Sequence, residues 1–111
     1  LEAAGPYVQM VEVADDLGAE RSTLISPAMY RRFIKPREQQ LSAMIHELAP
    51  EAFIIHHTDG NVFAIIPDLI ECGVSVLNPQ VGANGLDSLA RACWWISPPH
   101  DSAASSRCGE R

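Results

Sequence analysis

Apolar residues along the chain follow two patterns, one typical of strands and one typical of helices. Apolar runs rich in β-branched residues occur at 8–14, 53–57 and 74–77, and polar or turn-forming residues end each run. Between the runs, apolar positions at spacings of three and four predict helices over 27–48 and 62–72. Strands that alternate with helices predict an α/β fold whose strands are parallel neighbours in sequence order.

Local signals mark the ends of these helices. Ser26 suits the N-cap of the first helix, and Pro27 suits its first position. Pro36 interrupts the apolar stripe, so we expect a kink or two abutting helices just before it. Gly73 is a natural end for the second helix.

The remaining signals concern surface segments and one thiol. Gly82 to Gly85 predicts a flexible loop, and Leu86 to Cys93 predicts the beginning of another helix. Cys72 is expected on a buried helix face as a structural thiol. A basic cluster on the first helix is expected to be a solvated outer face, and it comprises Arg31, Arg32, Lys35 and Arg37.

The composition is that of one ordinary globular domain. The chain has 111 residues, of which 47% are hydrophobic and 20% are charged. Its net charge of −6 argues against nucleic acid or an anionic membrane as a partner, and no apolar run approaches the ~20 residues of a membrane span. Three cysteines without a C-x-x-C motif fit a reducing compartment, so we expect a cytoplasmic protein.

The pattern changes near Trp94. Residues 1–92 carry the predicted domain, whereas 93–111 form an irregular tail of Ser, Ala and Pro with no apolar face. We expect this tail to be poorly ordered or to result from a frame shift. The chain begins at Leu1 and not at Met, so we expect a piece of a longer protein.

Polar residues follow each predicted strand, and they are the candidate site. The central run ends in His57 and Asp59, which can act as metal ligands or as an acid–base pair, although Asp-Gly is also ordinary turn chemistry. The carboxyl ends of parallel strands meet at one rim of a sheet, so we expect Asp15, His57, Asp59 and Asn78 to line that rim. The adjacent Asp15 and Asp16 carboxylates repel each other and favour a cation, a basic ligand group or plain solvation.

Several motifs then follow one another in a specific order: Asp15-Asp16-Leu17-Gly18, Leu24-Ile25-Ser26-Pro27, Tyr30 to Pro36, His57 to Asn61, Ile66 to Glu71 and Leu77-Asn78-Pro79. This order resembles the uroporphyrinogen decarboxylase family, which also contains the cobalamin-dependent methyltransferases. The resemblance implies a TIM-type (β/α)8 barrel, of which this chain would hold about three β/α units. It also implies that the substrate-binding residues are Asp15, Asp16 and Asn78, with catalytic residues unknown.

The resemblance implies one of two activities for the parent enzyme. One is a carboxy-lyase of porphyrin biosynthesis, which acts on a tetrapyrrole without a cofactor. The other is a methyltransferase served by a methyl-corrinoid protein, whose His-x-Cys-Gly zinc motif resembles the stretch from His57 to Gly60. Asp59 stands in place of that cysteine, and a carboxylate is an acceptable zinc ligand. The metal ligands implied are therefore His57 and Asp59, and two ligands alone should hold zinc weakly.

The alternative hypothesis is that the chain is a catalytically inactive, truncated α/β fragment that is structured only by self-association. Three parallel strands leave two unpaired edges, which a closed barrel removes. A homo-oligomer would cover such edges, and size-exclusion chromatography separates this reading from a compact monomer. Under either reading we expect the chain alone to be inactive, because most strands of the barrel are missing.

Overall fold

The computed structural model describes residues 1–91 and confirms the predicted α/β fold. Three parallel strands form one sheet in the order β1 (Met10–Ala14), β2 (Phe53–Thr58) and β3 (Val76–Pro79). Parallel strands in sequence order, with helices between them, are the arrangement of consecutive units of a (β/α)8 barrel. The prediction for 93–111 lies outside the described residues.

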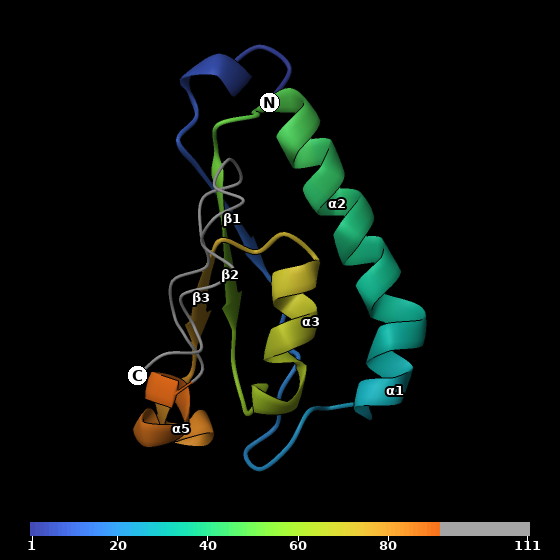
Figure 1. Cartoon of the computed structure of the whole chain (residues 1–111), viewed down its shortest axis with the longest axis vertical. Coiled ribbons are helices and arrows are strands. Elements are labelled where there is room, and N and C mark those ends of the chain that lie inside the picture. Colours follow the sequence, from blue (N-terminus) through green and yellow to red (C-terminus); the bar gives the residue numbers. More distant parts are fainter. Residues whose placement is uncertain (92–111) are drawn as a thin grey trace.

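The principal helices lie on one side of this sheet. Figure 1 shows α2 and α3 on the same side, with α5 and the short α1 near the carboxyl ends of the strands. None of the helices within residues 1–91 is long and apolar enough to cross a membrane. The helical elements are η1 (Gly5–Tyr7), α1 (Pro27–Met29), η2 (Tyr30–Ile34), α2 (Lys35–Leu48), η3 (Phe63–Ile65), α3 (Ile66–Glu71), α4 (Val81–Asn84) and α5 (Leu86–Arg91).

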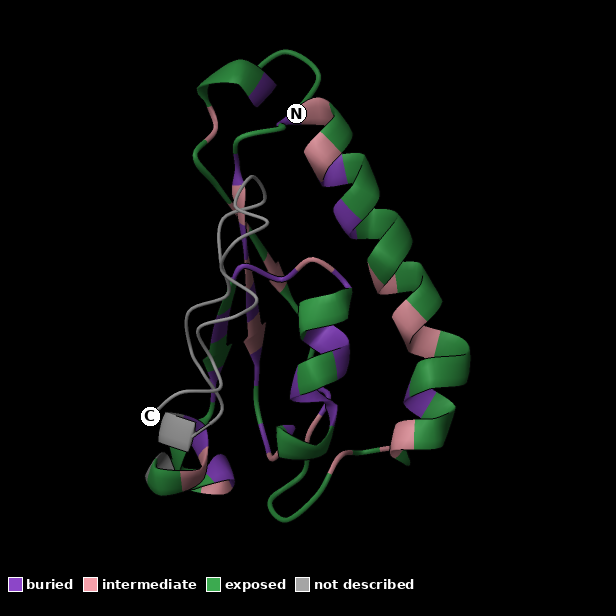
Figure 2. Ribbon diagram, in the orientation of Figure 1, coloured by how far each residue is buried: buried purple, intermediate pink, exposed green. Residues whose placement is uncertain are grey.

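The two faces of the sheet differ in burial because successive strand residues point to opposite sides. On β2, Ile54, His56 and Thr58 are buried, and alternate residues are only partly buried (Figure 2). The helix-covered face contributes to a core that comprises Leu17, Tyr30, Val62, Ile65, Ile66, Leu69, Val74, Leu77 and Leu89. We call the opposite side the open face, and its strand residues are Met10, Glu12, Ala14, Phe53, Ile55, His57, Val76 and Asn78.

The first helical segment changes type at the predicted position. Ser26 caps α1, because its Oγ accepts a hydrogen bond from the Met29 N–H at 3.2 Å. The chain then winds as a π-helix through Tyr30–Ile34 before α2 begins at Lys35. Pro36 has no N–H to donate and crowds the carbonyl four residues earlier, which accounts for the widened turn ahead of it.

Three predicted boundaries require correction. The first strand begins at Met10 and not at residue 8. The third strand is Val76–Pro79 and not 74–77. Pro79 fits there because the Gln80 N–H, and not residue 79, donates to the Thr58 carbonyl at 3.2 Å. Residues 82–85 were expected to form a flexible loop, yet Val81–Asn84 is the helix α4 and ends at Gly85 with φ 77°.

The basic cluster lies on an outer face as predicted, except that the Lys35 side chain is only 15% exposed, and two of its members form ion pairs that the sequence did not predict. Arg31 Nε donates to both Asp68 carboxylate oxygens at 3.0 Å, and Lys35 Nζ lies 2.9 Å from Asp68 Oδ1. Lys35 also contacts the Glu71 carboxylate. The Asp68 side chain is only 5% exposed, so these contacts join the first helical segment to α3.

Replacing Asp68 with asparagine should lower the free energy of unfolding by about 1–3 kcal/mol at pH 7. The Arg31 guanidinium and then Lys35 hold the pKa of Asp68 below its usual range. Such a group stabilises the fold above its unfolded pKa of about 4 and loses that effect as the pH falls through the lower folded value. Urea unfolding of Asp68→Asn and wild type should therefore converge in acid.

Glu71→Gln is the matched control for this prediction. The Glu71 side chain is 64% exposed, so its ion pair with Lys35 is screened and its loss should change stability by less than about 1 kcal/mol. Equal effects of the two substitutions, or a pH-independent effect at Asp68, would contradict the role given to the buried carboxylate.

Candidate functional site

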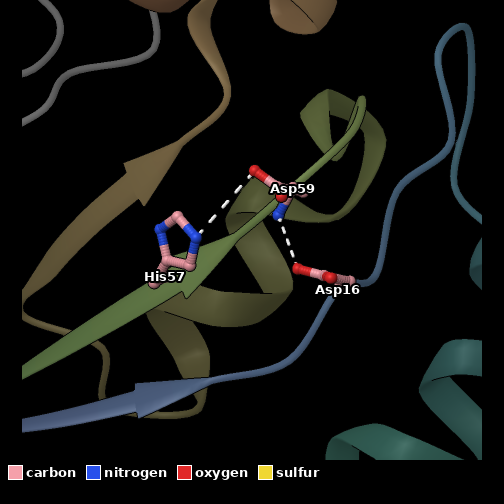
Figure 3. Close-up of side chains that lie close together, drawn as sticks. All are labelled: Asp16, His57 and Asp59. Atoms are coloured by element: carbon pink, nitrogen blue, oxygen red, sulfur yellow. Dashed lines mark hydrogen bonds and ion pairs between the residues drawn. The ribbon is translucent and has the colours of Figure 1, made fainter.

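The end of β2 and the loop after β1 bring three potential ligand residues together on the open face. His57 Nε2 lies 3.9 Å from Asp59 Oδ1, and Asp16 Oδ1 accepts a hydrogen bond from the Asp59 N–H at 3.1 Å (Figure 3). One ligand atom from each of the three residues lies within 4.8 Å of the others. We call Asp16, His57 and Asp59 the rim site.

A close backbone contact between two glycines holds the rim site together. The Gly18 N–H donates to the Asp59 carbonyl at 3.1 Å, and the Asn61 N–H donates to the Ala19 carbonyl at 2.6 Å. A Cβ on Gly60 would lie 2.1 Å from the Gly18 carbonyl carbon, so no side chain fits between the loops. Gly60 also has φ 76°, a conformation that favours glycine.

A buried amide fixes the other side of the same loop. Asn84 Oδ1 accepts from the Val62 N–H at 2.8 Å, and Nδ2 donates to the carbonyls of Gly60 and Gln80, both at 2.8 Å. Asn84 is only 5% exposed. The three bonds use the amide as both donor and acceptor, so α4 and the loop after β2 form one unit.

Side-chain alternation separates the predicted rim residues. The register pairs Ala14 with His57 and His57 with Asn78, so Asn78 lies beside His57 on the open face. Asp15 has the parity of Val13 and lines a cavity on the helix-covered side, together with His56. The structure therefore brings Asp16, and not Asp15, to His57 and Asp59. The assignment of Asp15, Asp16 and Asn78 to substrate binding remains a prediction.

His57 does not point into the helix–sheet layer, which His56 occupies instead. His56 is 3% exposed, whereas the His57 side chain is 38% exposed. Burial lowers the pKa of the His56 imidazole, and the nearby Glu38 and Asp15 carboxylates partly oppose this effect. The two adjacent histidines thus have different environments, and His57 is the one exposed on the open face.

Cys72 is a buried thiol, as the sequence predicts. Burial raises its pKa to about 11, with the Glu38 carboxylate adding to the effect. Burial also raises the pKa of Tyr30, whose hydroxyl donates to Glu38. A buried thiol with this pKa carries little thiolate at neutral pH, which fits the structural role expected of Cys72.

The rim site has the types of donor group that divalent metals bind, one imidazole and two carboxylates. Tetrahedral zinc with bonds of about 2.0–2.2 Å places its ligand atoms about 3.3–3.6 Å apart. The 3.9 Å between His57 and Asp59 needs only a small closure to reach that spacing. The hydrogen bond from the Asp59 N–H orients the Asp16 carboxylate, as outer contacts orient metal ligands. The sequence predicts only His57 and Asp59 as metal ligands, and Asp16 joins them through the fold of the loop after β1.

Comparison with known protein families identifies the family of this chain. A family model described as uroporphyrinogen decarboxylase (URO-D) matches residues 3–87, a span that contains every residue of the rim site. No curated protein and no solved structure matches this chain significantly.

Proposed function

We propose, from the premise that this chain belongs to the uroporphyrinogen decarboxylase family, that its rim site binds zinc and that the parent enzyme transfers a methyl group. The observation that supports this proposal is the convergence of one imidazole and two carboxylates within 4.8 Å on the open face. Zinc accepts such ligands, and a catalytic zinc site commonly has three protein ligands and one open position.

Each member of the site has a role under this proposal. His57 supplies its Nε2, and Asp16 and Asp59 each supply a carboxylate oxygen. A bound zinc ion would act as a Lewis acid that activates a thiol of the substrate. Asn78, beside His57 on the open face, would offer its amide to a polar group of that substrate.

Charge at the rim favours a metal-dependent reaction over the direct binding of an acidic substrate. Asp16 and Asp59 lie close together, and Glu12 lies on the same open face. Without a cation, these carboxylates would repel the acidic side chains of a tetrapyrrole. A zinc ion neutralises the two carboxylates that bind it.

A decarboxylase is the second candidate, and one hollow favours it. A depression of about 330 Å³ at the same end of the sheet is lined by Arg21, Asn61 and Phe63 among others. Arg21 is the only basic residue of this lining within residues 1–91, and a guanidinium can bind a carboxylate through two hydrogen bonds. This reaction would not require the rim site to bind a metal.

Isothermal titration with zinc tests the metal site. The full chain should carry Cys93→Ser and Cys108→Ser, so that their thiols cannot bind the ion. Because Asp16 adds a third ligand, we expect one site with tighter binding than a two-ligand site gives. His57→Ala and Asp16→Asn should each weaken binding by at least about tenfold.

Asp15→Asn is the matched control, because it removes the neighbouring carboxylate on the other side of the sheet. It should leave zinc binding unchanged to within about twofold. If His57→Ala and Asp16→Asn bind zinc as tightly as the unsubstituted site does, the rim site is not the zinc site and the decarboxylase is the better candidate.

A further inference from the structure

A second cluster of polar groups lies on the helix-covered side of the sheet. Asp15, Glu38, Ser42 and His56 line a cavity of about 160 Å³ between the strands and α2. An apolar cavity of about 150 Å³ holds a molecule of benzene's size, so this one has room for a ligand of about six non-hydrogen atoms. The exposed Asp15 and Leu41, itself 39% exposed, lie at its mouth.

Two buried polar atoms of this cavity have no hydrogen-bond partner among residues 1–91. They are Nε2 of His56, a residue only 3% exposed, and Oε1 of Glu38. The other Glu38 oxygen is already used, since it accepts from the Tyr30 hydroxyl and lies 3.8 Å from the Cys72 sulfur. Buried polar atoms are rarely left unpaired, so a molecule held in the cavity, water or a ligand, is expected to bond to these two.

Within the described part of the chain, one nitrogen of the His56 ring lies unpaired at the cavity. Nε2 has no hydrogen-bond partner among residues 1–91, and the Asp15 N–H is already donated to the His57 carbonyl at 3.2 Å, so the Asp15 backbone can meet the ring only with its carbonyl. In the tautomer whose Nδ1 donates to that carbonyl, Nε2 carries a lone pair and accepts a hydrogen bond.

We propose that this cavity binds a small organic cation that donates several N–H hydrogen bonds, a primary alkylammonium. His56 Nε2, Glu38 Oε1 and the Asp15 carboxylate are all acceptors, and the two carboxylates attract positive charge. The walls formed by Val13, Leu41 and Val74 suit a short alkyl chain.

The spacing of the acceptors distinguishes this ligand from a bare metal ion. Among residues 1–91, the rim site is the only group of three such residues whose ligand atoms lie within 4.8 Å of one another. The acceptors around the helix-side cavity are more widely separated, which suits a ligand larger than a metal ion. An anion would be repelled by Asp15 and Glu38.

Titration of the ¹⁵N-labelled full chain with propylammonium chloride tests this proposal, with the imidazole nitrogens followed by NMR. We expect saturable shifts at His56 with a dissociation constant of about 1 mM, and no shifts at His57. Asp15→Asn should weaken binding by about tenfold, whereas Asp16→Asn, on the open face, should not change it. Leu41→Trp, which fills the mouth without altering charge, should also weaken binding.

Tetramethylammonium is the matched probe, because it has the same charge and no N–H group. Equal chemical-shift changes at His56 with both cations would show that positive charge alone causes them, which would overturn the proposal. An equal loss of binding in Asp15→Asn and Asp16→Asn would overturn it as well. These outcomes are independent of zinc binding, because the two sites lie on opposite faces of the sheet.

Discussion

Replacing Gly60 with alanine should lower the free energy of unfolding by about 3 kcal/mol or more, the largest effect expected of any single substitution here. The added Cβ would approach the Gly18 backbone to 2.1 Å, a distance that forces the two loops apart. The backbone at residue 60 also has φ 76°, a conformation in which an L residue with a side chain is strained. Urea denaturation followed by circular dichroism measures the loss.

Gly82→Ala is the control for this substitution. A Cβ there would meet no atom within 4 Å, and residue 82 lies within the helix Val81–Asn84. Alanine is the better helix former, so the variant should be as stable as wild type or more stable by up to about 1 kcal/mol. A Gly60→Ala protein that unfolds at the same urea concentration as Gly82→Ala would contradict the close contact of the loops.

The Gly60 substitution should also reduce zinc binding. Asp16 precedes Gly18 by two residues, and Asp59 immediately precedes Gly60, so separating the glycines separates these ligands. Under native conditions, the folded fraction of Gly60→Ala should bind zinc more weakly than Gly82→Ala binds it. Structural and functional losses thus have a common origin in one backbone contact.

Asn84→Asp should destabilise the protein by about 2–4 kcal/mol at pH 7, although it hardly changes the size of the side chain. The Val62 N–H keeps its acceptor, but the carbonyls of Gly60 and Gln80 lose their donor and face a buried carboxylate. Protonation of the new carboxyl group restores one donor. The difference from wild type in urea unfolding should therefore shrink as the pH falls.

Asn78→Asp provides the comparison for the same chemical change at an exposed position. Asn78 lies on the open face, and its replacement should alter stability by no more than about 0.5 kcal/mol. If the two substitutions have similar effects, the hydrogen bonds of Asn84 do not hold the loop.

The strands and their parallel order are predictable from sequence because local patterns determine them. The alternation Val11, Val13 on β1 and the apolar run ending at His57 mark strands, and the intervening helix requires a crossover. The N-cap at Ser26 and the helix break ahead of Pro36 are likewise local features, and the structure confirms both.

Contacts between distant segments could not be predicted in the same way. Asp68 is 37 residues from Arg31, and no spacing rule indicates that they pair. The local sequence places Asn84 in a Gly-rich loop. Its role as a buried hydrogen-bonding residue depends on the Val62 N–H, 22 residues earlier, which no local pattern indicates. The choice of Asp16 over Asp15 as neighbour of His57 depends on strand register, which only the paired strands define.

Asp15-Asp16 and His56-His57 are pairs of identical adjacent residues, so each pair presents one side chain to each face of the sheet whatever the register of its strand. A slip of β1 by one residue would exchange the faces of all its side chains, yet each face would still receive one aspartate. The aliphatic residues have no such degeneracy, because the slip would place Glu12 beneath the helices in place of Val11 and Val13. The register of β1 is therefore fixed by its aliphatic residues, and not by the residues that carry reactive groups.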